Sequence, residues 1–101
     1  MTVFRHVVLF RWNDDVDETH IALVENRLDA LPAAIPEIRD YRHGADAGLA
    51  EGNFDYVVVG DFDSVDDYMV YRDHAAHQAL ISDVLAGRIS ERAAVQHELE
   101  G

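Results

Sequence analysis

Two stretches of this sequence are apolar on both faces of the strands that they predict. The first is VFRHVVLFRW, residues 3–12, where β-branched and aromatic side chains indicate a strand and positions 7–10 are apolar without interruption. The second is FDYVVVGDF, residues 54–62, with three consecutive valines at its centre. A strand that faces solvent on one side alternates apolar and polar residues. Both faces of these two strands should therefore be covered.

Two helices are predicted from the spacing of apolar residues. The first occupies residues 17–31, and the prolines at positions 32 and 36 are expected to end it. The second occupies residues 65–85, with Ser64 as its predicted N-cap and a break expected near Asp73. Each helix follows one of the two apolar strands along the chain.

Two further strands complete the pattern. EIRDYRHGAD, residues 37–46, is a weaker strand candidate that Gly44 is expected to end or bulge, and AAVQHEL, residues 93–99, alternates enough to be a closing strand. The order β-α-β-β-α-β predicts an α+β, ferredoxin-like fold with two helices on one face of a four-stranded antiparallel sheet. A length of 101 residues suits a single domain spanning residues 1–101.

The second face of the predicted sheet needs a cover that this chain does not supply. Two helices can cover only one face, yet the strands starting at Val3 and Phe54 are apolar on both sides. Large exposed apolar patches usually mark an interface, and two-fold homodimers are the commonest oligomers. We therefore expect a homodimer.

The charge of the chain excludes several classes of partner. Its formal net charge is −12, and its eight basic side chains other than histidine are all arginine. This field repels phosphate backbones, so we expect neither nucleic-acid nor membrane binding. The N-terminal MTVFRHVVLF lacks the pattern of a signal peptide, and no apolar run is long enough to span a bilayer. A cytoplasmic protein is expected.

The segment YRDHAAHQAL, residues 71–80, contains the candidate reactive groups. His77 begins an apolar helical stripe that continues with Leu80 and Ile81, so it should point toward the sheet. His74 lies one turn before His77, and Tyr71 lies one turn before His74, so the three would border one cavity in a continuous helix. An imidazole beside a phenol can move a proton and stabilise an oxyanion. The alternative is a core histidine bonded to a backbone carbonyl, with the tyrosine ring packed over the sheet.

A metal site is a weaker interpretation of the same segment. His74 and His77 are three residues apart and could share an ion with help from Asp73, but stable sites need three or four ligands. Others would have to come from His6 or His43, without a spacing rule. We expect no metal and no cofactor, and assign no role to the histidines at positions 20, 43 and 97.

Three stretches, FRHVVLFRW, DYVVVGDFDSVDDYMVY and DHAAHQAL, together with the order of the elements, resemble the Dabb family of stress-responsive dimeric α/β-barrel proteins. Ala75 stands where the family pattern usually has proline. The resemblance implies two ferredoxin-like subunits whose sheets meet in a barrel. One branch of the family cyclises polyketide chains with a tyrosine and a histidine that resemble Tyr71 and His77. Its first-strand histidine resembles His6, whereas Tyr56 stands where that branch has a third-strand histidine.

These observations predict a cavity between the helices and the sheet, which His77 and Tyr71 face as catalytic residues and which His6 reaches from the first strand. His74 is expected to help bind the substrate. The cavity walls are expected to suit a small apolar carbonyl compound and to consist of Val8, Phe10, Leu28, Tyr56, Val58, Leu80 and Ile81.

The resulting function prediction is a cofactor-independent cyclase or lyase that uses tyrosine–histidine acid–base chemistry on an apolar carbonyl substrate. Two alternatives stay open. One is a non-catalytic, stress-associated dimer that binds a ligand in the same cavity. The other is a cofactor-free monooxygenase of the related dimeric barrels.

Overall fold

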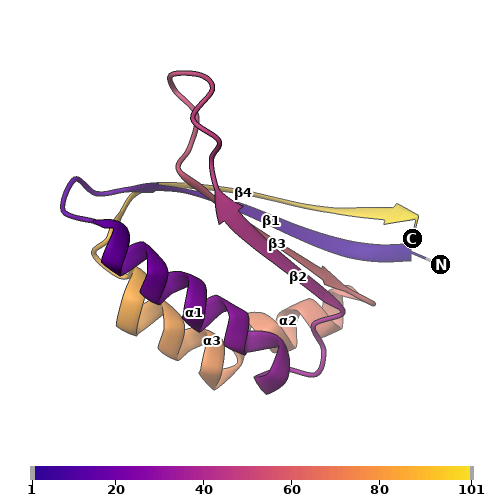
Figure 1. Ribbon diagram of the computed structural model, residues 1–101. Coiled ribbons are helices and arrows are strands. Elements are labelled where there is room, and N and C mark those ends of the chain that lie inside the picture. The colour runs from indigo at the N-terminus through magenta and orange to yellow at the C-terminus, as the bar shows by residue number, and fades with distance from the viewer. Residues whose placement is uncertain (1, 101) are drawn as a thin grey trace.

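The computed structural model of the protein describes residues 2–100 and places four strands in one antiparallel sheet with all the helices on one side (Figure 1). The elements in chain order are β1 (Thr2–Trp12), α1 (Glu18–Ala34), β2 (Asp40–Ala45), β3 (Tyr56–Phe62), α2 (Val65–Asp73), α3 (Ala75–Leu80), the π-helical turn η1 (Ile81–Leu85) and β4 (Ile89–Glu100). The strand order is β2-β3-β1-β4. The ferredoxin-like prediction is confirmed.

The core lies between the helices and one face of the sheet. Alternate residues of β1 face the helices, and His6, Val8 and Phe10 among them are buried. Tyr56 and Val58 of β3 lie directly opposite Phe10 and Val8 in the register of the sheet. The helices contribute the buried side chains Val24, Leu28, Leu31, Tyr71, Leu80 and Val84.

Helix α1 runs past the point where the prolines were expected to end it. Pro32 lies inside the helix, which continues to Ala34. A proline in the last turn removes only one helical hydrogen bond near an end that would fray anyway. Ile35 donates its N–H to the Leu31 carbonyl at 2.9 Å and is 0% exposed, so packing holds the final turn in place.

The predicted break in the second helical region is confirmed at His74. Its backbone is extended, with φ −63° and ψ 139°, and it separates α2 from α3. The side chain of His74 caps the new helix, because its Nδ1 accepts a hydrogen bond from the Ala76 N–H at 3.0 Å. The Ser64 cap is also present, with Oγ accepting from the Asp67 N–H at 3.1 Å.

Two of the predicted strand features differ in the structure. Gly44 neither ends nor bulges β2, because it pairs with Val57 in an uninterrupted register. β4 begins at Ile89, four residues before the predicted start, and pairs with the whole of β1. Its polar composition hides its length from sequence analysis, because an edge strand is not required to be apolar.

The sheet face away from the helices carries two rows of apolar side chains. One row consists of Val59, Val7 and Val95 on β3, β1 and β4, and the next consists of Val57, Leu9 and Ala93. Val95 is 62% exposed. We call this surface the open face.

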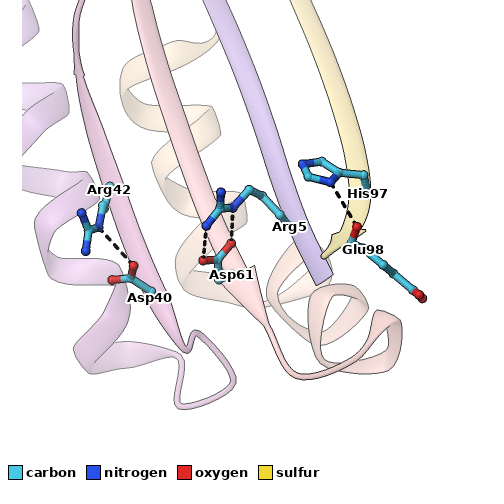
Figure 2. A network of polar contacts seen from close by, with 6 residues as sticks. All are labelled: Arg5, Asp40, Arg42, Asp61, His97 and Glu98. Carbon is cyan, nitrogen blue, oxygen red and sulfur yellow. Dashed lines mark hydrogen bonds and ion pairs between the residues drawn. The ribbon is translucent and has the colours of Figure 1, made fainter. Parts of the chain in front are cut away.

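Ion pairs lie beside these rows on the same face (Figure 2). Arg5 Nε and Nη2 donate to the two carboxylate oxygens of Asp61 at 2.8 and 2.9 Å. The Arg5 hydrogen bonds hold the pKa of Asp61 below its usual range although Asp61 is buried. Arg42 pairs with Asp40 at 3.1 Å on β2. The apolar rows are thus bordered by charges that are neutralised within the sheet.

Candidate active site

A cavity of about 500 Å³ lies between the helices and the sheet. Its volume is within the range that holds small organic ligands. Most of its walls are apolar, and polar side chains enter it from α2, α3, β1, β2 and β4. Nine residues predicted for the site line it: His6, Val8, Phe10, Leu28, Val58, Tyr71, His77, Leu80 and Ile81.

His77 lies near the start of α3 with one ring nitrogen already occupied. Its Nδ1 lies 3.0 Å from the carbonyl oxygen of Arg72. A carbonyl can only accept, so Nδ1 carries the proton and Nε2 of the neutral ring has a free lone pair. Burial lowers the pKa of His77 below its ordinary value, with a smaller contribution from Arg92. The neutral, proton-accepting form is therefore favoured.

The Tyr71 ring packs against the His77 ring from the neighbouring helix. The ring centroids are 4.2 Å apart, and Tyr71 is 2% exposed. Its hydroxyl lies 2.8 Å from the hydroxyl of Tyr41 on β2. Burial raises the pKa of Tyr71 to about 12, so the phenol stays protonated at neutral pH. A protonated phenol next to a neutral imidazole provides an acid and a base in one place.

His6 enters the cavity from β1 and is also neutral. It is 4% exposed, and the side-chain amide nitrogen of Gln96 lies 2.8 Å from its Nδ1. Burial, followed by the charge of Arg92 and the proximity of His77, lowers the pKa of His6 to about 4. With the amide donating to Nδ1, the ring proton lies on Nε2. His6 is thus a hydrogen-bond donor at neutral pH.

Two predicted site residues do not line this cavity. His74 lies at the break between α2 and α3, where its side chain caps the helix, because the helix is not continuous there. Tyr56 is 2% exposed and packs within the core, with its hydroxyl 2.6 Å from Nδ1 of His43. The prediction that both border the cavity is therefore wrong.

His43, to which no role was assigned from the sequence, lies at the edge of the core. Its side chain is 10% exposed, and its Nε2 lies 2.6 Å from Oδ1 of Asp29. The chain Tyr56–His43–Asp29 joins β3, β2 and α1 beside the cavity. The other two histidines without an assigned role also have partners: His20 Nε2 lies 2.7 Å from the Val84 carbonyl, and His97 Nδ1 lies 3.3 Å from the Glu98 carbonyl.

No group of three or more histidine, cysteine or acidic side chains within residues 2–100 is placed to hold a metal ion. In the same part of the chain, no helix is long and apolar enough to cross a membrane.

The family model of the stress responsive A/B barrel domain, Dabb, matches residues 4–97. The chain belongs to the Dabb family. No curated protein matches the sequence significantly.

Solved structures similar to this Dabb chain fall into two groups by sequence identity. A dimeric ferredoxin-like protein of unknown function from Thermobifida fusca is 45% identical, with a TM-score of 0.89 over 97% of this chain and 92% of that one. A dimeric protein of unknown function from Bacteroides fragilis is 32% identical, with a TM-score of 0.81 over 96% of each chain. The hydroxynitrile lyase of Passiflora edulis is 16% identical, with a TM-score of 0.85 over 97% of this chain and 94% of that one, and shares the fold.

Tyr41 and Arg92, which line the Dabb cavity, and Gln96, which bonds the cavity residue His6, were not anticipated as site residues from the sequence. Tyr41 comes from the weaker strand, and its ring fits beside Gly60, where an added Cβ would meet Tyr41 Cδ1 at 3.3 Å. Gln96 and Arg92 come from β4, directly opposite His6 and Phe10 of β1. Alternation along residues 89–100 places Arg92 and Gln96 on one face, and this signal could have shown that they share a side of the sheet.

Proposed function

We propose that this Dabb protein is a homodimer whose subunits each bind an apolar carbonyl compound in the cavity and move a proton of that compound with His77 and Tyr71. The observation that supports this most directly is the close contact between the two rings. Its ring centroids are 4.2 Å apart at the wall of a cavity of about 500 Å³.

His77 would be the base in this proposal. The Arg72 carbonyl occupies its Nδ1 and leaves Nε2 to take a proton from the carbon next to the substrate carbonyl. Positioned proton transfer of this kind contributes about a hundred- to ten-thousandfold in rate. The protonation state of His77 suits this role, because burial lowers its pKa and keeps the base form populated.

Tyr71 would be the acid that stabilises the resulting oxyanion. With Tyr41 donating to the Tyr71 oxygen across 2.8 Å, the Tyr71 proton is free to bind the substrate oxygen. Such a bond is stronger to the developing oxyanion than to the neutral carbonyl oxygen. Cyclisation and carbon–carbon bond cleavage can both proceed through an oxyanion of this kind, so a cyclase- or lyase-like reaction fits the site.

The dimer is supported by the open face. Its two apolar rows cross three adjacent strands, and the helices lie on the other side of the sheet (Figure 1). The 45% identical protein from Thermobifida fusca is described as dimeric. A second copy would bury the rows of both subunits and leave the cavity on the helix side free to bind a ligand.

Deuterium exchange tests the acid–base proposal without knowledge of the substrate. A simple ketone probe such as 4-phenylbutan-2-one is incubated with the protein in D₂O, and loss of the proton next to the carbonyl is followed by NMR. We expect the native protein to accelerate exchange and His77→Ala to reduce that acceleration about a hundredfold or more. His77→Ala should still fold, because Gln78 Nε2 also donates to the Arg72 carbonyl, at 2.7 Å.

His97→Ala is the matched control, because His97 lies on the open face and only bonds a neighbouring carbonyl. It should leave exchange unchanged. If the ketone binds but exchanges no faster than in buffer, the acid–base proposal is wrong. The protein would then be a ligand-binding dimer, a function that the apolar walls of the cavity support by themselves.

A further inference from the structure

Arg92 differs from every other arginine of the chain. The sequence contains eight arginines, and seven form an ion pair with an aspartate or glutamate: Arg5, Arg11, Arg27, Arg39, Arg42, Arg72 and Arg88. Within residues 2–100, Arg92 has neither an acidic partner nor a side-chain hydrogen bond. Arg92 is an exposed residue, so water solvates its charge and no acid of the described residues neutralises it.

The alternation of β4 explains how Arg92 is kept away from acids. Its neighbour Glu91 lies on the opposite side of the strand, where it pairs with Arg11 at 3.4 Å. Arg92 itself lies opposite Phe10 in the sheet and lines the cavity. The fold therefore brings an unpaired guanidinium to a cavity whose walls are mostly apolar.

Arg92 is also close enough to the other polar groups of the cavity to affect them. Its positive charge contributes to the lowered pKa of both His6 and His77. Arg72, the second arginine at the cavity, carries no comparable free charge, because its Nε and Nη2 donate to the two oxygens of Asp73 at 3.0 and 3.2 Å. Arg92 is thus the remaining cation of the cavity.

We propose that the ligand of this cavity is an apolar carboxylic acid whose carboxylate binds Arg92. The inference rests on the proposed function, because it takes the cavity as the ligand site. It adds that the ligand carries a carboxylate as well as the carbonyl group on which His77 and Tyr71 act. The substrate class is then an apolar oxo acid. A single guanidinium presents two parallel N–H donors, which match the two oxygens of a carboxylate.

The net charge of the protein allows this proposal to be tested by ligand preference. A net charge of −12 repels anions at long range, so this repulsion by itself would make acids bind more weakly than neutral ligands. A preference for an acid over its uncharged analogue must then come from a local cation. Among the described residues that line the cavity, Arg92 supplies it.

The test compares acids with their amides of the same shape. Three pairs of increasing size are titrated by calorimetry: hexanoate and hexanamide, 3-phenylpropanoate and 3-phenylpropanamide, and decanoate and decanamide. Hydrogen bonds to a charged group favour the acid by roughly ten- to a hundredfold in affinity. We expect at least one acid to bind the native protein about tenfold or more tightly than its amide.

Arg92→Gln should remove this preference while leaving amide binding unchanged. Arg88→Gln is the matched control: it removes the same charge from an arginine that pairs with Asp15 outside the cavity, at 3.5 Å, and should change neither affinity. The ketone exchange assay is run on the same three proteins, so that the acid preference and the acid–base proposal are scored separately.

The outcomes separate the two proposals. Amides that bind as tightly as acids, or an equal loss of acid binding in both variants, would overturn the carboxylate proposal and leave the cavity as a site for neutral ligands. An acid preference that depends on Arg92, without any exchange activity, would support the carboxylate proposal and contradict acid–base catalysis. Failure of every acid to bind would overturn the carboxylate proposal, whether or not the ketone exchanges. An Arg92→Gln protein that loses only its dimer mass would show that Arg92 pairs with the partner subunit and would also overturn the proposal.

Discussion

The hydrogen bond between the hydroxyls of Tyr41 and Tyr71 leads to a quantitative prediction. The two oxygens are 2.8 Å apart, and the rings pack edge to face with centroids 5.8 Å apart. Replacing either tyrosine with phenylalanine removes one oxygen and keeps this ring contact. Any change in the free energy of unfolding therefore reports on the hydroxyls.

The expected magnitude follows from what each variant leaves behind. Tyr41→Phe leaves the buried Tyr71 hydroxyl without its partner, and Tyr71→Phe does the same to Tyr41. An unsatisfied buried hydroxyl costs about 1–3 kcal/mol. The lower end applies here, because both residues line a cavity that is large enough to admit water. Each variant should lose about 1 kcal/mol, which lowers the melting temperature by roughly 4–8 °C for a domain of this size.

The double variant should lose less than the sum of the single losses, because removing both partners leaves no unsatisfied group. We expect a coupling free energy of about 0.5 kcal/mol or more in a double-mutant cycle measured by urea denaturation. The protomer concentration is held constant, since dimerisation contributes to the apparent stability. In the exchange assay, Tyr71→Phe should reduce the rate more than Tyr41→Phe, because Tyr41 acts only by orienting Tyr71.

Tyr68→Phe is the matched control for this cycle. Tyr68 packs against the same aromatic group, with its ring 5.5 Å from Phe62, but its hydroxyl has no hydrogen bond within the described residues. Its replacement should change stability by less than about 0.5 kcal/mol. If the losses at Tyr41 and Tyr71 add within about 0.3 kcal/mol, the two hydroxyls do not interact and the proposed orientation of Tyr71 is wrong.

Three further predictions concern the dimer, the net charge and the buried histidine. Light scattering at micromolar concentration should give the mass of a dimer. Val95→Lys should shift this mass toward that of the monomer, whereas Val70→Lys on the exposed side of α2 should not. A monomer mass for the native protein would contradict the proposed interface. Added salt should raise the melting temperature until screening saturates, because a net charge of −12 opposes the compact state, and a melting temperature that does not change with salt would show that this repulsion is negligible. The pKa of His6 is lowered to about 4, below its ordinary value near 6.5, so the unfolded chain binds the proton more readily than the folded protein. The free energy of unfolding should therefore fall by up to about 3 kcal/mol as the pH is lowered from about 6.5 to about 4. His6→Phe should remove that part of the pH dependence, and an NMR titration of His6 with a midpoint near 6.5 would refute it.

Local patterns in the sequence were enough to predict the order of the elements. Strand alternation, helical spacing and the Ser64 cap depend only on residues that are close along the chain, and the structure follows each of them. The direction of His77 also follows from local spacing, since it begins the stripe that continues at Leu80. The apolar centres of β1 and β3 predicted that the sheet needs a second cover before any fold was known.

The hydrogen-bonding partners within the cavity depend on the register of the sheet instead. Tyr41 and Tyr71 are 30 residues apart, and His6 and Gln96 are 90 apart. Whether such residues meet is decided by which elements pack together and in which register, because a shift of one residue turns every side chain of a strand to the other face. The room that Gly60 leaves for the Tyr41 ring likewise exists only once β2 and β3 lie side by side.

The misplaced residues have the same physical origin. The steps from Tyr71 through His74 to His77 place all three at one cavity only in a continuous helix, and the break at His74 turns that residue into a cap. Tyr56 was placed correctly on the helix side of β3, but its hydroxyl is bonded to His43 on the adjacent strand. The sequence by itself determined which side of each element faces the core. Tertiary structure decided which polar groups meet there, because those contacts join segments whose separation along the chain is closed only by folding.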